Sequence, residues 1–365
     1  ECREGKCYPT GDGWTAITEC DDYSKSFYNI RESGNYYLAN DLESRGDGNC
    51  LNVNNLKDVV IDGLGHKITG KKIASETSGV NFNYIENGVI KNLFIDRYVF
   101  CGLSIKYSSN NVFSNLILFN NSEKGICLDF SLDNTFSDIN ASNNGISGLY
   151  LYRSEENGFL NIVANNNSAG LILQGSSNNR LSNLNLSKNS IAGIVLFDSS
   201  LTNSFLEVLS ENNDYGFYFL DSSSNSISES VICNNLEGDF YCVNSNDLTG
   251  ENNYLDSIGD CGDNIVYTSC NGEKDVSFEY SCENLDFNCD GEISQEDIDI
   301  IIGFWQSPIN LIEFMETNEC SYLNTYLEYV FSEELYNEVS VGDLIVHEIT
   351  MDEAVGLQYF YQSNC

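Results

Sequence analysis

The sequence predicts a mainly β protein built as a parallel β-helix solenoid, and three observations support this fold class. A glycine returns every 22 or 23 residues, at Gly79, Gly102, Gly125, Gly148, Gly170, Gly193 and Gly216. The positions one and three residues after each glycine are apolar, and serine and asparagine recur six and nine residues after it. A period of this length, with strand-like alternation between polar turns, is typical of a stacked solenoid.

The apolar positions of each repeat predict its strands. The pairs after the glycines alternate with polar residues, as in Leu103 and Ile105, which indicates a short strand with one buried face. A second apolar set follows about 11, 14 and 16 residues after the glycine, as in Phe113, Leu116 and Leu118. Each repeat therefore contains at least two short strands, and the repeat count predicts about eight or nine coils.

The polar positions predict the turns. Serine occupies the sixth position at Ser108, Ser131, Ser154, Ser176, Ser199 and Ser222. Asparagine occupies the ninth position at Asn111, Asn134, Asn157, Asn179 and Asn225, and Asn203 stands one residue late, as if that turn had gained a residue. Because an asparagine amide can bond the equivalent amide in the next coil and tolerates left-handed backbone, we expect asparagine ladders at these turns.

Three parts are expected along the chain. Residues 1–47 lack the repeat and contain three cysteines and several aromatic residues, which suits an N-terminal cap over the open first coil. Residues 48–270 form the parallel β-helix. Residues 271–365 differ in chemistry and are expected to form a small α-helical, calcium-binding domain.

Charge limits the function. The chain has 55 acidic and 17 basic residues, and a net charge of −38 at pH 7. Nucleic-acid binding is excluded, because phosphate contacts need clustered lysine and arginine. No apolar run is long enough to span a membrane, and we expect that a signal peptide has already been removed ahead of Glu1.

The cysteines predict disulfides and an exported protein. There are fourteen, with no C-x-x-C pair and only two histidines in the chain, which argues against a zinc or copper framework. Disulfides in an oxidising, extracellular or cell-surface location explain them better. The candidates are Cys2, Cys7, Cys20, Cys50, Cys101, Cys127, Cys233, Cys242, Cys261, Cys270, Cys282, Cys289, Cys320 and Cys365.

Four N-x-S/T sequons lie within the predicted solenoid. Glycosylation is expected at one or more of Asn120, Asn140, Asn166 and Asn185.

A calcium loop is predicted near the C-terminus. Oxygen-bearing side chains stand at positions 1, 3, 5, 9 and 12 of one loop, a glycine stands at position 6, and the carbonyl of position 7 supplies a further oxygen. Calcium prefers six to eight oxygen ligands, and this spacing wraps them around one ion. The predicted ligands are Asp286, Asn288, Asp290, Glu292, Ser294 and Asp297. Aspartate at position 12 makes the loop resemble dockerin modules more than sensor EF-hands.

The segment CLNVNNLKDVVIDGLGHKITG at residues 50–70, followed by the repeats, resembles the NosD-like, or CASH, family of right-handed parallel β-helix proteins. The resemblance covers roughly residues 27–260 and implies the fold, whereas the function of such modules varies. It also implies a surface protein of archaeal type. The copper-site role of NosD gains no support here, because the chain has only two methionines and two histidines.

These features predict a secreted structural or interaction protein that is not an enzyme. The expected assembly is a filament or surface layer, formed by head-to-tail self-association or by docking to another surface protein, with calcium as the cofactor. The alternative is a polysaccharide-active β-helix enzyme or glycan-binding module. Its candidate residues are Asp198 and Asp221, which occupy the same position in adjacent coils and could act as a carboxylate pair.

Overall fold

A computed structural model describes residues 2–3, 6–7, 13–20, 28–44, 48–71, 77–261 and 264–270. The chain divides into two units, residues 8–274 and a second unit of residues 1–7 with 275–365. In the second unit the strands β1 (Cys2–Arg3) and β2 (Lys6–Cys7) form an antiparallel pair. The predicted α-helical domain, with all six calcium ligands, lies outside the described residues.

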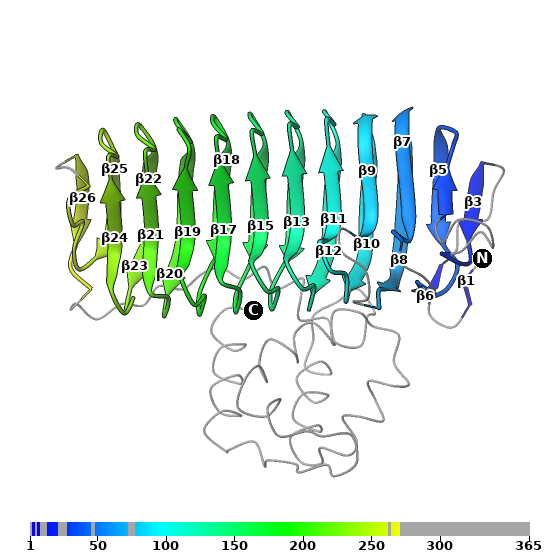
Figure 1. Cartoon of the computed structure of the whole chain (residues 1–365), viewed down its shortest axis with the longest axis horizontal. Helices are drawn as coiled ribbons and strands as arrows, with labels where there is room; N and C mark the ends of the chain where they lie inside the picture. Colours follow the sequence, from blue (N-terminus) through cyan, green and yellow to red (C-terminus); the bar gives the residue numbers. More distant parts are fainter. Residues whose placement is uncertain are drawn as a thin grey trace, which may run out of the picture. The chain divides into compact units, whose positions relative to one another are not determined.

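The unit of residues 8–274 is a β-solenoid in which two parallel sheets run along the stack (Figure 1). The ten-stranded sheet consists of β4 (Tyr28–Ile30), β7 (Leu51–Lys57), β9 (Ser78–Glu86), β11 (Cys101–Lys106), β13 (Lys124–Asp129), β15 (Ser147–Tyr152), β17 (Ala169–Gln174), β19 (Ala192–Phe197), β21 (Tyr215–Leu220) and β24 (Gly238–Val243).

The fourteen-stranded sheet forms the other wall. It consists of β3 (Trp14–Ile17), β5 (Gly34–Leu38), β6 (Leu42–Glu43), β8 (Val59–Thr69), β10 (Val89–Asp96), β12 (Val112–Phe119), β14 (Thr135–Asn140), β16 (Gly158–Val163), β18 (Arg180–Asn185), β20 (Ser204–Glu211), β22 (Ser226–Ser228), β23 (Val231–Cys233), β25 (Gly250–Leu255) and β26 (Ile265–Thr268). Successive coils pair in parallel, as predicted.

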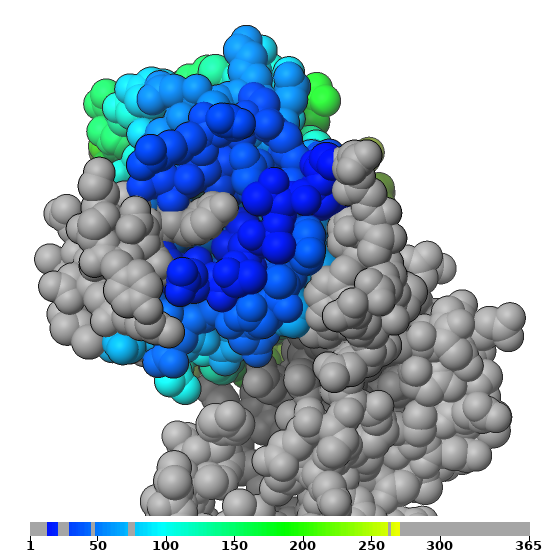
Figure 2. Space-filling view, turned by 90° about the vertical axis from the view of Figure 1, so that its right-hand side faces the viewer, coloured from blue at the N-terminus to red at the C-terminus, as the bar shows by residue number. Residues whose placement is uncertain are grey.

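The described solenoid has about ten coils rather than the eight or nine predicted, because coils form where the glycine repeat is absent. Within the segment predicted as a cap, β4 pairs with β7, and β5 pairs with both β3 and β8. Figure 2 looks onto this end of the stack, where the darkest blue residues, from the first strands, lie in front of the later coils.

The core follows the predicted apolar positions. Leu103 and Ile105 of β11 are fully buried, and so are Phe113, Leu116 and Leu118 of β12. Equivalent residues stack from coil to coil. Rings of Phe113, Phe136 and Phe159 lie in one column with centroids 4.7 Å apart. This spacing equals the distance between neighbouring strands, so one column of side chains fills the core coil by coil.

The predicted asparagine ladder is confirmed. Each amide nitrogen from Asn111 to Asn203 donates to the amide oxygen of the next coil over 2.9–3.1 Å, through Asn134, Asn157 and Asn179 and ending at Asn225. The serine ladder is confirmed with one correction, because Ser200 rather than Ser199 accepts from the N–H of Ser176. The extra residue lies directly after β19, where Asp198 and Ser199 both adopt left-handed backbone.

A second asparagine ladder lines the opposite turn and was not predicted. It comprises Asn121, Asn144, Asn167, Asn189, Asn213 and Asn235, each of which bonds the next. The same spacing of 22 to 24 residues could have shown it in the sequence.

Four disulfides cross-link the solenoid, and they confirm the predicted disulfide bonding of eight candidate cysteines. They join Cys20 to Cys50, Cys101 to Cys127, Cys233 to Cys270 and Cys242 to Cys261. Side chains of the other six, Cys2, Cys7, Cys282, Cys289, Cys320 and Cys365, lie outside the described part.

The repeating glycine is required by close packing. A Cβ on Gly148 would lie 2.5 Å from the Ala164 Cβ and 2.6 Å from the Ala141 carbonyl oxygen. We expect Gly148→Ala to lower the free energy of unfolding by about 1–3 kcal/mol, because backbone must shift to admit the methyl group. Gly158→Ala is the matched control, since a Cβ there meets nothing within 4 Å. Urea unfolding of both variants measures the difference, and equal stability of the two would contradict the packing argument.

Candidate functional site

The outward face of the ten-stranded sheet carries an unusual set of polar and aromatic side chains. Successive residues of a strand point to opposite faces, so the residues between the core positions face outward. The register places Lys106, Asp129, Tyr152 and Gln174 in one row across β11, β13, β15 and β17. Tyr150 lies in the neighbouring row, beside Cys127. We call these five residues with Lys124 and Asp198 the central cluster.

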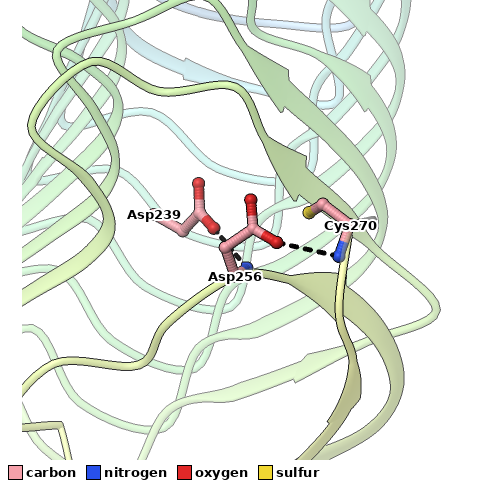
Figure 3. A group of neighbouring side chains, drawn as sticks. All are labelled: Asp239, Asp256 and Cys270. Carbon is pink, nitrogen blue, oxygen red and sulfur yellow. Dashed lines mark hydrogen bonds between the residues drawn. The ribbon is translucent and has the colours of Figure 1, made fainter. Parts of the chain in front are cut away.

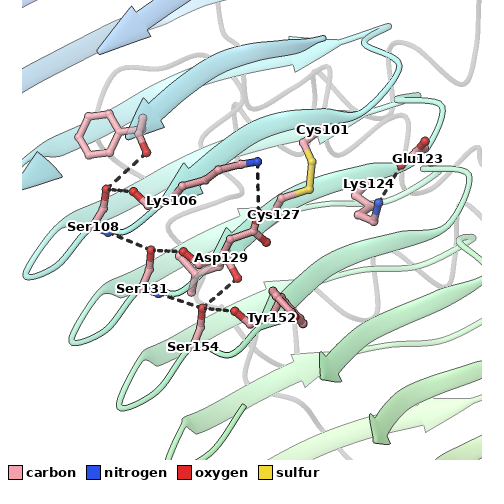
Figure 4. Close-up of polar contacts among 12 residues, drawn as sticks. Cys101, Lys106, Ser108, Glu123, Lys124, Cys127, Asp129, Ser131, Tyr152 and Ser154 are labelled. Atoms are coloured by element: carbon pink, nitrogen blue, oxygen red, sulfur yellow. Dashed lines mark hydrogen bonds and ion pairs between the residues drawn. A yellow bond between two sulfur atoms is a disulfide. The ribbon is translucent and has the colours of Figure 1, made fainter. Parts of the chain in front are cut away.

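Basic groups gather here although the chain as a whole is strongly acidic. The Nζ of Lys106 lies 3.3 Å from the Asp129 carboxylate, and the Nζ of Lys124 lies 2.8 Å from the Glu123 carboxylate (Figure 4). The Lys124 ammonium also lies over the ring of Tyr150, 5.3 Å from its centroid. Lysine over an aromatic face is held by the ring quadrupole, which helps to explain why this side chain is buried.

Tyr150 is fixed by a chain of hydrogen bonds. Its hydroxyl donates to Oε1 of Gln174, and Nε2 of Gln174 donates to the Asp198 carboxylate over 2.7 Å. Burial raises the pKa of the Tyr150 phenol above its ordinary value, and the negative charge of Asp129 raises it further. The phenol is therefore protonated across neutral pH and can serve as a proton donor.

An exposed row of aromatic rings borders the central cluster. Tyr107 and Phe130 directly follow β11 and β13, and Tyr84 holds the equivalent position within β9; the exposed fractions of Tyr84, Tyr107 and Phe130 are 51%, 48% and 37%. Their rings stack nearly parallel, with centroids 4.8 and 5.2 Å apart. The fourth position is Arg153, whose guanidinium lies 5.8 Å from the Phe130 centroid and 5.2 Å from that of Tyr152. We call Tyr84, Tyr107, Phe130 and Arg153 the edge row.

Sequence reasoning missed the edge row. These residues hold the fifth position after the repeating glycine, the position that also supplied Asp198 and Asp221. The shared position could have been found by counting from each glycine. The residue type at this position changes from coil to coil, however, so it does not stand out as a repeat.

The structure gives the carboxylates of Asp198 and Asp221 different hydrogen-bond partners. The Asp198 carboxylate accepts from Gln174 in the preceding coil, whereas the Asp221 carboxylate accepts from Asn244 in the following coil over 3.0 Å. The two carboxylates therefore bond to opposite neighbouring coils, and the Ser199 N–H donates to the Asp221 carbonyl oxygen between the two turns. Asp198 instead supports Tyr150 through Gln174.

A hollow lies where the turns lead into β14, β16 and β18. Its lining includes Asp133 and Glu156, which hold equivalent turn positions in adjacent coils, together with Gly158 and Arg180. The missing side chain at Gly158 leaves the space open. This carboxylate pair was not predicted.

The four sequons differ in accessibility. Asn120 is exposed, Asn140 and Asn166 are half-buried, and Asn185 is only 8% exposed. Because a glycan must project into solvent, Asn120 suits modification best and Asn185 suits it least.

An acidic cluster at the C-terminal end of the solenoid is structural. Asp239 accepts from the N–H of Asp256 over 2.6 Å and from Asn235, and Asp256 accepts from the N–H of Cys270 (Figure 3). Burial raises the pKa of Asp239. Since the Cys270 sulfur is in a disulfide, the group lacks a thiolate ligand and its carboxylates serve the backbone.

A family model described as periplasmic copper-binding protein (NosD) matches residues 29–207, just under half of the chain. This match agrees with the predicted NosD-like resemblance. Copper itself does not fit the described residues, because their one histidine, His66, is engaged with Asp41 and eight of their cysteines are in disulfides. No curated protein matches the chain.

Solved structures with the same fold include an epimerase module, a phage tailspike and a glucanase. The A-module of mannuronan C-5 epimerase AlgE6 from Azotobacter vinelandii is 15% identical, with a TM-score of 0.56, over 70% of this chain and 78% of that one. Tailspike protein 2 of an Escherichia coli O157:H7 bacteriophage is 16% identical (TM-score 0.51, 70% and 42% covered). The α-1,3-glucanase catalytic unit from Streptomyces thermodiastaticus is 14% identical (TM-score 0.50, 72% and 63% covered).

These neighbours contradict the prediction that the chain is not an enzyme. β-helices that share its architecture include an epimerase module and a glucanase catalytic unit, so this fold is compatible with catalysis. At 14–16% identity the likeness itself concerns the fold.

The expected export agrees with the structure and the family match. Four disulfides and a family described as periplasmic fit an exported protein. Among the described residues, no helix is long and apolar enough to cross a membrane.

Proposed function

We propose that this chain is an exported polysaccharide-active β-helix enzyme whose substrate lies along the outward face of the ten-stranded sheet. The observation that carries the proposal is the central cluster, where a protonated phenol is held in place beside two lysines and a carboxylate. Tyr150 is assigned as the proton donor, Gln174 and Asp198 as its positioning residues, and Lys106 and Lys124 as cationic contacts for the sugar.

The cluster suits proton transfer better than hydrolysis by paired carboxylates. Asp129 and Asp198 stand three coils apart, which is about 14 Å at the spacing of parallel strands. Glycosidase carboxylates are about 5 to 9.5 Å apart. A phenol can instead give a proton to a bound sugar, and the ammonium groups can stabilise negative charge that develops on that sugar.

A second candidate is hydrolysis at the hollow of Asp133 and Glu156. The specific observation in its favour is that these carboxylates occupy adjacent coils, about one strand spacing apart, beside an arginine.

A substrate screen tests the proposal. The full chain is incubated with acidic and neutral polysaccharides, and products are followed by NMR, by ultraviolet absorbance of unsaturated sugars and by reducing ends. We expect turnover of at least one polymer. If Glu156→Gln abolishes the formation of reducing ends and Tyr150→Phe does not, the chemistry belongs to the hollow. Inactivity of the wild-type chain on every polymer would overturn the enzymatic proposal.

Calcium binding at the loop from Asp286 to Asp297, and docking through that domain to another copy or another surface protein, are also proposed. They rest on the ligand spacing alone.

A further inference from the structure

We infer that the edge row is a binding platform for an acidic polysaccharide, with the carboxylate of one sugar held by Arg153. The inference rests on the proposed function, because the same glycan chain would continue from the edge row into the central cluster. It names the substrate class, which the proposed function leaves open.

The aromatic part of the row has no role in the core. Tyr84, Tyr107 and Phe130 are about half exposed, and together they form a continuous apolar strip over three coils of a highly charged protein. The rings are nearly parallel, with centroids about 5 Å apart, and each residue is 37–51% exposed, so part of the row faces solvent. Exposed apolar strips with polar borders are typical of binding surfaces.

Backbone geometry reinforces this view. Tyr84, Tyr107, Phe130 and Arg153 all have positive φ, between 48° and 56°. Bulky side chains are disfavoured in this region, where asparagine and glycine fit best. The same turn position carries Gly175 and Asn244 elsewhere along the solenoid. Large rings at the strained position therefore point to a role other than folding.

Arg153 supplies the charge. Its guanidinium lies over two aromatic rings, and no carboxylate of the described residues lies within 4.0 Å of it. A guanidinium has five N–H donors, and those not turned toward the rings can bind a planar anion such as a carboxylate. Lys106 and Lys124 on the adjoining strands each pair with a carboxylate, so the charge that an anionic sugar would meet in the edge row comes from Arg153.

The edge row also explains how a chain could be aligned. The rings run along the stack, and the edge contact between Phe130 and Tyr152, with centroids 5.1 Å apart, joins the row to the central cluster. A glycan that stacks on the rings is thereby led toward Tyr150.

Binding measurements with defined variants test the inference. Calorimetry uses polyuronate and the same polymer after reduction of its carboxyl groups. Arg153→Gln is expected to weaken polyuronate binding about tenfold to a hundredfold and to leave the reduced polymer unchanged, with Arg153→Lys intermediate. Tyr107→Asn, which suits the left-handed backbone, is expected to weaken binding of both polymers. The exposed Tyr267→Asn serves as the control, and thermal melting reports folding of every variant.

The outcomes separate the two proposals. Polyuronate binding that is unchanged in Arg153→Gln and Tyr107→Asn would overturn the platform while leaving Tyr150 as the proposed proton donor. Turnover of neutral polymers alone would overturn the acidic substrate and leave the enzymatic proposal intact. A wild-type chain that binds and converts no polysaccharide would overturn both.

Discussion

Asn157→Ala is expected to lower the free energy of unfolding by about 3–5 kcal/mol. The side chain is 1% exposed and its amide nitrogen donates to the carbonyl oxygens of Ser131 and Glu155 and to Asn179. Its amide oxygen accepts from both nitrogens of Asn134. Alanine leaves several buried polar groups without partners, and each costs about 1–3 kcal/mol.

Urea unfolding followed by circular dichroism measures the loss. Asn246→Ala is the control, because Asn246 is an exposed turn asparagine outside both ladders, and a change within about 0.5 kcal/mol is expected there. A loss below about 1 kcal/mol in Asn157→Ala would show that the ladder contributes little beyond what water supplies.

Tyr150→Phe is expected to reduce turnover of the polysaccharide substrate by about a hundredfold or more, with little change in binding. The substitution keeps the ring under the Lys124 ammonium and removes the hydroxyl that donates to Gln174. A positioned proton donor contributes about 10²–10⁴ in rate, and that factor is lost with the hydroxyl. Initial rates and substrate affinity are measured separately, so that kcat and binding can be compared.

Tyr218→Phe provides the matched control. Tyr218 occupies the same outward row of the ten-stranded sheet, paired with Val195, and lies three coils beyond Tyr150. Its substitution is expected to leave turnover unchanged. Equal rates for wild type and Tyr150→Phe would remove the phenol from the chemistry.

Sequence reasoning predicted the interior of this protein far better than its surface. Core pairs such as Leu103 and Ile105, and the ladder from Asn111 to Asn225, recur because every coil must satisfy the same packing and hydrogen bonds. Counting from the glycine placed Ser199 wrongly, since it could not tell where in the turn the extra residue lies.

The candidate site escaped prediction for the opposite reason. Tyr107, Phe130 and Arg153 share one turn position but differ in side-chain chemistry. A binding site uses different residue types in successive coils, because it contacts different parts of its substrate there. Asp198 was selected as half of a carboxylate pair, yet its hydrogen bond to Gln174 makes it a support for Tyr150. The role of Asp198 depends on the direction of its side chain, and the spacing of residues in the sequence does not reveal that direction.

The asparagine ladders give the solenoid a direction. In the ladder from Asn111 to Asn225 every amide nitrogen points toward the C-terminal coils and every amide oxygen toward the N-terminal coils. Aligned amide dipoles add, as they do in a helix, and neighbouring bonds polarise one another. The ladder therefore has a donor end toward the C-terminal coils and an acceptor end toward the N-terminal coils. A coil that ran in the opposite direction could not continue the ladder, because its amide nitrogen would face the amide nitrogen of its neighbour.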